Sequence, residues 1–302
     1  MKPDVSAVIV TFQSEGWIGR CLSAVQTNAR AGVEIVVVDN ASTDRTIDVV
    51  RTSAPHATLI SLDRNRGFAA AANIGAASST AGRLLFLNPD AEIQGGAIDA
   101  LGTFLNANPT AAAAGPRFLS PDGSPQDSAF TYPTLLMTWL EFFHRPARLL
   151  RTRWNGRLAS PNGQPIFVDY PLGACMLVKH AAWEDVGPFD ERFVLYCEEV
   201  DWCVRAKQKG WDIAHVPSAV VIHEGGASAA SARASSLAHL YASRRYLHRK
   251  HRGNLYRAAD AVIMRIGLNH ERRRLSRLLA THADDDVAER LRGIELALQR
   301  VP

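Results

Sequence analysis

The sequence of 302 residues has few cysteines, and their spacing gives them no common role. None of the four, Cys21, Cys175, Cys197 and Cys203, forms a C-x-x-C pair. This excludes a zinc ribbon, a thioredoxin-like redox site and a disulfide framework. We therefore expect four buried thiols in a reducing compartment.

Long apolar runs are also missing. The longest one outside the first strand-like segment, residues 135–143, contains Glu141 and falls far short of the ~20 residues that a membrane span needs. Met1 to Asp4 lead directly into a strand-like segment, without the pattern of a signal peptide. We expect a cytoplasmic protein, at most peripheral at the inner face of a membrane.

Two phosphate-binding motifs are absent as well. No G-x-G-x-x-G follows the first apolar run, and no G-x-x-x-x-G-K-[ST] occurs anywhere in the chain. These absences argue against a dinucleotide cofactor on a Rossmann fold and exclude a P-loop nucleotidase.

What the first part of the chain does have is an alternation of buried-strand and helical patterns. Apolar, β-branched runs predict strands at 5–10, 33–38, 58–62 and 83–87. The segments between them predict helices at 15–29 and 68–78, and a helix through Val50 that residues 42–44 can cap. Such alternation is typical of an α/β fold with a mostly parallel central sheet.

Polar residues stand where these strands end. They are Thr11, Asp39 with Asn40, Asn65, and Asn88 with Asp90. Ligands of open α/β sheets bind beyond the carboxyl ends of the strands, so we expect these residues to surround one crevice. Capping and turn formation are the alternative role for Asp39 and Asp90.

A second ordered block spans residues 167–228. It predicts strands at 173–178 and 216–223 and a helix at 199–209, which begins beside Glu198, Glu199 and Asp201. Crowded carboxyl groups raise one another's pKa, which makes one of them a usable general base toward a sugar hydroxyl. An acidic first helical turn, stabilised by the helix dipole, is the alternative.

Two residues are candidate metal ligands. The carboxylate of Asp90 suits a hard divalent cation that bridges the phosphates of a nucleotide, and His223 ends a strand that we expect to face the same crevice. A turn residue and a structural histidine are the alternatives.

We divide the chain into four parts: an α/β nucleotide-binding half at 1–118, a connector with mobile loops at 119–166, a catalytic half at 167–232 and a helical extension at 233–302. The extension carries 15 lysines and arginines against 7 acids, whereas the chain before it has a balance of −4. This asymmetry favours an anionic partner, with a solvated helical face as the alternative.

The chain resembles the family-two inverting glycosyltransferases, most closely their rhamnosyltransferase-like branch. The resemblance spans residues 5–228 and rests on eight motifs in the family's order: Val8–Phe12, Val36–Asp44, Asn65–Phe68 with Asn73–Gly75, Leu87–Asp90, Gly173–Met176, Phe189–Phe193, Glu198–Cys203 and His223.

The resemblance implies a GT-A fold, a nucleoside-diphosphate-sugar donor and a divalent metal ion, Mg²⁺ or Mn²⁺. It places Asp90 and His223 at the metal, with Asn88 in place of the first acid of the family's D-x-D motif. The implied donor-binding residues are Thr11, Phe12, Asp39, Asn40, Asn65, Phe68, Asn73 and Asn88.

The family's base is usually the aspartate of a Glu-Asp pair, and here the matching position is Glu199, with Asp201 as a rival. Glutamate is one methylene longer, and a misplacement of ~1 Å can cost on the order of 10²-fold in rate. We expect acceptor-side contacts from Tyr196, Glu198, Trp202 and Arg205.

The implied reaction moves L-rhamnose or a hexose from dTDP-rhamnose or a UDP-hexose to a hydroxyl of a cell-envelope glycan or a polyprenyl-diphosphate-linked acceptor. A sugar-nucleotide-binding protein with little or no transferase activity is the alternative. The basic tail favours peripheral membrane contact, and a solvated bundle or a homo-oligomer interface stays open. Aromatic residues are not interleaved with its arginines, which argues against nucleic acid.

Overall fold

The computed structural model describes residues 3–28, 32–143, 155–225, 233–281 and 284–301. The chain divides into two compact units, and each is described by itself. The first unit comprises residues 1–131, 158–192 and 198–228, and the second comprises 132–157, 193–197 and 229–302. The segment predicted as a connector therefore contributes to both units, which differs from the four-part division expected from the sequence.

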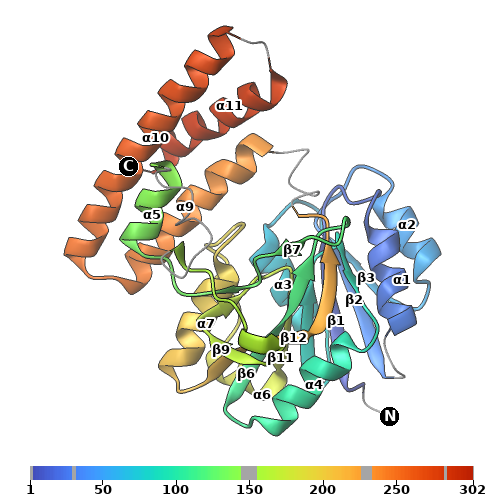
Figure 1. Cartoon of the computed structure of the whole chain (residues 1–302). Coiled ribbons are helices and arrows are strands. Elements are labelled where there is room, and N and C mark those ends of the chain that lie inside the picture. Colours follow the sequence, from blue (N-terminus) through green and yellow to red (C-terminus); the bar gives the residue numbers. More distant parts are fainter. Residues whose placement is uncertain (1–2, 29–31, 144–154, 226–232, 282–283, 302) are drawn as a thin grey trace. The chain divides into compact units, whose positions relative to one another are not determined.

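The first unit is built on a twisted mixed sheet in the order β3-β2-β1-β4-β11-β6-β12-β5 (Figure 1). The four strands predicted in the first part of the chain lie next to one another in parallel: β1 (Val5–Thr11), β2 (Val33–Asp39), β3 (Thr58–Ser61) and β4 (Arg83–Leu87). The helices between them are α1 (Ile18–Asn28), α2 (Thr46–Ser53) and α3 (Phe68–Ala77). The predicted α/β fold and these elements are confirmed, with small differences at their ends.

The rest of the sheet mixes directions. Its strands are β5 (Ala91–Ile93), β6 (Ala111–Leu119), β11 (Cys175–Lys179) and β12 (Asp212–His223). β11 runs antiparallel to both β4 and β6, whereas β12 runs parallel to β6 and antiparallel to β5. The remaining elements of the unit are short strands and helices: β7 (Pro125–Gln126), β8 (Ala129–Phe130), η3 (Pro161–Gly163), β9 (Ile166–Val168), β10 (Tyr170–Pro171), α4 (Ala97–Ala107), α6 (His180–Val186) and α7 (Glu198–Gln208).

Side chains that alternate along the strands divide the core into two layers. Ala7 and Ile9 of β1 and Leu85 of β4 pack in the layer that includes α1, α2 and α4. On the other face Phe86 contacts the rings of Trp183 and Phe189. Both faces of β1, β2 and β4 are therefore covered toward their carboxyl ends, which explains why these strands are mostly apolar rather than alternating.

The four cysteines are buried and free of disulfides, as the sequence predicts. The strand β6 was missed by sequence reasoning because residues 111–114 are all alanine, which has no strand preference. These four alanines are fully buried between neighbouring strands.

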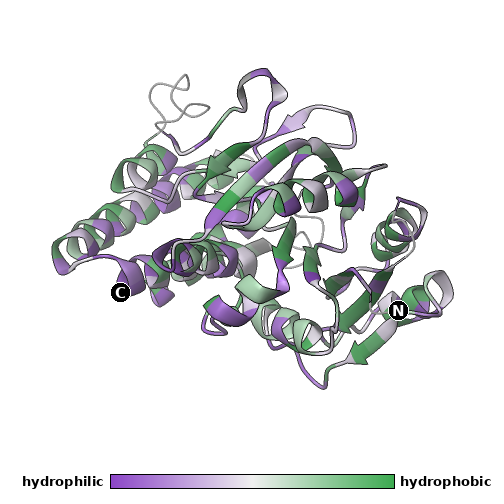
Figure 2. Cartoon of the chain, turned by 90° about the horizontal axis from the view of Figure 1, so that it is seen from below, coloured by the Kyte–Doolittle hydropathy of each residue, from purple (hydrophilic) through white to green (hydrophobic). Residues whose placement is uncertain are grey.

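The second unit is helical. It contains α5 (Leu135–Phe142), α9 (Arg233–His251), α10 (Asn254–Thr281) and α11 (Asp285–Arg300), and it has an apolar core of its own around Tyr241, Met264 and Ile294. Figure 2 shows polar and apolar residues mixed along the helices next to the C-terminus. Within the described residues, no helix combines the length and the apolar character needed to cross a bilayer.

Gly75 tests how closely α3 packs on the sheet. A Cβ atom at this position would lie 2.5 Å from Cγ1 of Val8 and 3.1 Å from Cγ2 of Val38. We expect Gly75→Ala to lower the free energy of unfolding by about 1–3 kcal/mol despite the better helix propensity of alanine. Chemical denaturation measures this change.

The matched control is Gly102→Ala in α4, where an added Cβ has no atom within 4 Å. We expect this variant to be stabilised by roughly 0.5–1 kcal/mol. Equal effects of the two substitutions would contradict the close approach of α3 to the sheet.

Candidate active site

The ends of β1 and β2 place two predicted donor residues side by side. Thr11 and Asp39 are paired in register, and the Thr11 hydroxyl donates to Oδ1 of Asp39 at 3.0 Å. The backbone N–H of Ser42 donates to the other carboxylate oxygen, also at 3.0 Å. Both side chains are almost fully buried, so the Asp39 carboxylate is held in one orientation at the edge of the sheet. Phe12, which follows Thr11 in the sequence, is half-buried.

Asn40 fixes the loop that precedes α3. Its amide nitrogen donates to Oδ1 of Asn65 at 3.0 Å and to the carbonyl oxygen of Gly67 at 3.1 Å, and its oxygen accepts from the N–H of Arg66 at 2.8 Å. Gly67 has φ of +84°, a conformation that favours glycine, and it is followed directly by Phe68. Asn40 and Asn65 thus form one network that shapes this loop.

Asn73 lies on α3 and holds a distant segment. Its amide group accepts from the N–H of Phe189 at 3.0 Å and donates to the carbonyl oxygen of the same residue at 2.9 Å. It also donates to Oε1 of Glu191 at 3.1 Å. The contacts that the structure gives Asn73 are therefore contacts with the segment at 189–191.

Asp90 and His223 meet beside the end of β4. His223 ends β12 and pairs with Ala91 of β5, which places its Nε2 3.5 Å from Oδ1 of Asp90. Both side chains are buried. Asn88, half-buried, lies two residues before Asp90, and its N–H donates to the carbonyl oxygen of Ala174.

Gln126 of β7 orients the imidazole of His223. Its amide nitrogen donates to the backbone oxygen of His223 at 2.6 Å, and its Oε1 lies 3.1 Å from Nδ1 of the ring. An Nδ1–H that donates to this oxygen leaves the lone pair on Nε2, and no described residue forms a hydrogen bond with Nε2. This is the arrangement of a histidine prepared to bind a metal ion through Nε2.

The pair fits a divalent cation held jointly by protein and nucleotide. Among the described residues, no group of three histidine, cysteine, aspartate or glutamate side chains could hold a metal ion by itself. Nucleotide-bound Mg²⁺ is usually held by one or two protein ligands together with phosphate oxygens and water. Asp90 and His223 would supply the protein's share.

The acidic cluster stands at the start of α7. The carboxyl group of Glu199 lies against the backbone of Gly173, and a Cβ at residue 173 would be 3.0 Å from Cδ of Glu199 and 3.2 Å from its Oε1. Glycine at 173 therefore makes room for the carboxyl group of this side chain, which is one methylene longer than aspartate. Oε2 of Glu199 is buried, and none of the described residues donates a hydrogen bond to it.

Burial changes the acidity of both glutamates. It raises the pKa of Glu199 from its ordinary value of 4.5 to about 7. The pKa of Glu198 is also raised well above its ordinary value, first by burial and then by the charge of Glu199. Near neutral pH Glu199 can thus both accept and release a proton, which a general base requires.

The other residues predicted near this cluster have structural contacts. Asp201 is fully buried and accepts from Nε of Arg205 at 2.9 Å. Arg205 also donates to the carbonyl oxygens of Val186 and Pro188. Trp202 is fully buried and donates its indole N–H to the carbonyl oxygen of Gly187 at 3.0 Å. These contacts hold α7 in place, and they favour Glu199 over Asp201 as the residue that an acceptor can reach.

A family model described as glycosyl transferase family 2 matches residues 6–167, more than half of the chain. The chain belongs to glycosyl transferase family 2. An N-acetylglucosaminyl-diphospho-decaprenol L-rhamnosyltransferase of Mycobacterium tuberculosis is 31% identical over 252 residues, which cover 79% of this chain and 81% of that protein. A dTDP-rhamnosyl transferase, RfbF, of Shigella flexneri is 26% identical over 235 residues, 75% of this chain and 71% of that protein.

A solved structure supports the same fold. The mannosyltransferase PcManGT from Pyrobaculum calidifontis, in complex with GDP-Man and Mn²⁺, superimposes with a TM-score of 0.60 at 16% identity and covers 99% of this chain and 86% of that one. This likeness confirms the GT-A fold expected from the sequence, and the family match with the relative from Mycobacterium tuberculosis confirms the expected glycosyltransferase activity. The Mn²⁺ in that complex supports a divalent metal ion in the family.

Sequence reasoning did not select three residues that contact the predicted site residues or the loops beside them. Gln126 follows no motif and lies in the segment predicted as a connector. Gly173 lies within a recognised motif, but its role depends on the length of Glu199. Gln13 accepts from the N–H groups of Thr43 and Asp44, and no pattern in the sequence indicates this pairing.

Backbone strain gathers around the predicted site residues. Five described residues other than glycine have positive φ: Gln13, Ala41, Asn162, Tyr196 and Cys197. Gln13 and Ala41 follow the ends of β1 and β2, and Tyr196 and Cys197 are the last residues before α7, although they belong to the second unit. Such conformations cost about 1–3 kcal/mol each and gather at active sites.

Because the pKa of Glu199 is raised, replacing this residue by an uncharged one should stabilise the protein, and the gain should depend on pH. Between pH 4.5 and 7 the native state holds a proton on this carboxyl group that the unfolded chain has lost, so ionisation increasingly opposes folding as the pH rises. We expect Glu199→Gln to raise the melting temperature clearly at pH 8 and much less at pH 5. Differential scanning calorimetry at both pH values measures this.

Glu295→Gln is the control, because Glu295 is exposed on α11. Its melting temperature should follow that of the wild type at both pH values. A gain for Glu199→Gln that is the same at pH 5 and pH 8 would contradict a buried, ionising Glu199.

Proposed function

We propose that this glycosyltransferase transfers a rhamnosyl or hexosyl group, with inversion, from dTDP-L-rhamnose or a UDP-hexose to a hydroxyl of a cell-envelope glycan or polyprenyl-diphosphate-linked acceptor. The observation that carries the proposal is the Glu199 carboxyl group, whose pKa is about 7 and whose buried Oε2 has no donor among the described residues. The names of the relatives from Mycobacterium tuberculosis and Shigella flexneri support rhamnosyl transfer.

The donor would bind beyond the ends of β1, β2 and β4. Asp39, oriented by Thr11 and Ser42, offers a fixed acceptor for the hydrogen-bond donors of the nucleoside. Asn40 and Asn65 shape the loop beside it, while Phe12 and Phe68 supply half-buried rings next to these polar groups. Asn73 would act by holding the segment at 189–191.

Asp90 and His223 would bind a divalent metal ion, Mg²⁺ or Mn²⁺, at the diphosphate. When bound, the ion supplies Lewis-acid stabilisation of the negative charge on the leaving diphosphate. His223 is kept in the required tautomer by Gln126, and Asn88 adds an amide near Asp90.

The chemical step would be a single in-line displacement. Glu199 removes the proton of the acceptor hydroxyl, and the oxygen forms a bond to the anomeric carbon of the donor sugar. The bond from that carbon to the diphosphate oxygen breaks, and the nucleoside diphosphate leaves with the electron pair from the opposite face. Burial and the charge of Glu199 raise the pKa of Glu198, which disfavours a second negative charge beside the base.

Binding of the donor product tests the first half of the site. We expect one of dTDP, UDP and GDP to bind tightly in the presence of Mn²⁺ and much more weakly without it, as measured by isothermal titration calorimetry. Asp90→Ala should remove most of the metal-dependent part of the affinity. Asp48→Ala, which removes an exposed carboxylate from α2, should change neither. Absence of binding by all three nucleotides would contradict the donor site.

Turnover tests the base. We expect Glu199→Gln to lower kcat by roughly 10²–10⁴-fold while nucleotide binding stays near that of the wild type. The kcat of the wild type should rise with pH through about 7 and level off above it, since the base must be deprotonated. Nucleotide binding without transfer to any acceptor would instead favour a sugar-nucleotide-binding protein.

Asp201→Asn separates the two candidate bases. Because Asp201 is buried and paired with Arg205, its replacement should clearly lower the free energy of unfolding. The kcat of the molecules that remain folded should change little. Full activity of Glu199→Gln together with an inactive, folded Asp201→Asn would reverse the assignment.

A further inference from the structure

The longest helix of the second unit, α10, is apolar on two opposite faces. One face contributes Met264, Leu268 and Leu275 to the core of the unit. The other carries Leu255, Val262 and Ile266, which are 90%, 56% and 52% exposed. Their spacing of seven and four residues places them on one stripe. A helix that only faces water does not need such a stripe.

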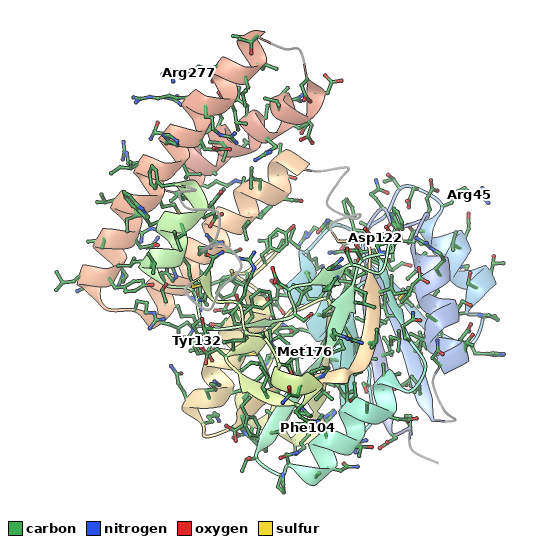
Figure 3. All side chains as sticks on the ribbon, viewed as in Figure 1. Arg45, Phe104, Asp122, Tyr132, Met176 and Arg277 are labelled. Atoms are coloured by element: carbon green, nitrogen blue, oxygen red, sulfur yellow. The ribbon has the colours of Figure 1, made fainter. Side chains whose placement is uncertain are left out.

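Arginines continue the same face. Arg273 and Arg277 follow Ile266 by seven and eleven residues, so they extend the stripe toward the end of α10, and both are exposed. Figure 3 shows Arg277 projecting from α10 on the side away from α11. Arg265 and Arg272 are exposed beside the stripe.

The acids of α10 do not offset this charge. The helix has six arginines and only two acids, Asp260 and Glu271. Asp260 is fully buried and pairs with Arg245 and His248, and Glu271 pairs with Arg274 and Arg290. The exposed face is therefore apolar at one end and positive at the other.

The helix α5 adds an aromatic border. It lies against α10, where the ring of Phe142 occupies the space that a side chain at Gly267 would need (Figure 1). The exposed Trp139 packs on Phe143 at 4.2 Å between ring centroids, and Phe143 contacts His270, one turn beyond Ile266. The contacts run from Trp139 through Phe143 and His270 to the edge of the stripe.

We propose that this face, formed by Leu255, Val262, Ile266, Arg273 and Arg277 with Trp139 at its border, docks on an anionic lipid bilayer. Apolar side chains beside arginines, with a tryptophan at the edge, are the composition of an interfacial helix. The inference deepens the proposed function, since it rests on a lipid-linked acceptor for its biological purpose.

The positive charge of this face disfavours a second copy of the chain as its binding partner. A two-fold contact through this face would place the same patch on both sides, so the arginines of one copy would meet either the arginines or the apolar side chains of the other, and the patch itself contains no acid to neutralise them. A bilayer with anionic headgroups supplies the opposite charge and accepts the apolar side chains at the same time.

Flotation of the full-length protein with vesicles tests the proposal, using vesicles of phosphatidylcholine alone or mixed with phosphatidylglycerol. We expect wild-type protein to float with the mixed vesicles and to bind the neutral ones much more weakly. Val262→Ser/Ile266→Ser should lower the partition coefficient on the order of tenfold. Arg273→Glu/Arg277→Glu should lower it by roughly fivefold or more for each arginine.

Two variants of the first unit are the matched controls. Phe167→Ser removes an exposed apolar side chain from β9, and Arg51→Glu reverses an exposed charge on α2. Both should float like the wild type. Circular dichroism shows whether each variant is folded, and a conservative Val262→Thr/Ile266→Thr pair keeps the test valid if the serine pair fails to fold.

Three results would overturn the proposal: equal binding to both kinds of vesicle, equal losses in the controls, or a stable dimer in sedimentation equilibrium that Val262→Ser/Ile266→Ser dissociates. The last result would assign the face to a second copy. Flotation uses no nucleotide, so its failure leaves the donor-binding titrations standing. Conversely, a protein that floats but binds no nucleotide would contradict the proposed function and not the docking face.

Discussion

The first unit depends on the burial of carboxyl groups at the ends of its strands and in the first turn of α7. A carboxylate removed from water is costly unless hydrogen bonds or an opposite charge stabilise it. The structure meets this cost in different ways at different positions. Asp39 accepts from Thr11 and Ser42, whereas Asp201 is paired with Arg205. Glu199 has no such donor for its Oε2 among the described residues, and its pKa rises to about 7 instead.

This difference separates Asp39 and Asp201, whose carboxylates hold neighbouring groups in place, from Glu199, whose carboxyl group can take part in proton transfer. A hydrogen-bonded or ion-paired carboxylate is stabilised in its charged form and is a poor base. Burial outweighs the backbone hydrogen bonds to the Glu199 carboxyl group and raises its pKa to about 7, so this group changes its protonation near neutral pH. The bare backbone of Gly173 completes the arrangement, because it leaves the space that the longer glutamate occupies. The departure from the Glu-Asp pair of the family thus has a steric counterpart at Gly173, in the turn before β11.

Much of the first unit follows from local sequence. Residues 5–10, 33–38 and 83–87 are β-branched or apolar apart from one polar residue each, Ser6, Glu34 and Arg83, which is the composition of strands covered on both faces. Their order with the intervening helices implies the parallel sheet, and Thr11, Asp39 and Asp90 fall at strand ends for that reason. Elements with weak local signals were missed: β6, with its four alanines, and α4 are held by packing against neighbours that are distant in the sequence.

The sequence by itself determined the family, the α/β alternation and the residues that end the strands, because these depend on side-chain type and periodicity along the chain. Only the tertiary structure decided how those residues are used. It directed Asn73 toward residues 189–191, placed Trp202 on the buried face of α7, set Gln126 against His223 and left the apolar stripe of α10 on an exposed face. Each of these outcomes joins groups between 15 and 118 residues apart, or depends on which face of a helix is covered. The periodicity of the sequence indicates that a helix has an apolar face. Where a helix has two, as α10 does, only packing decides which of them is buried in the core.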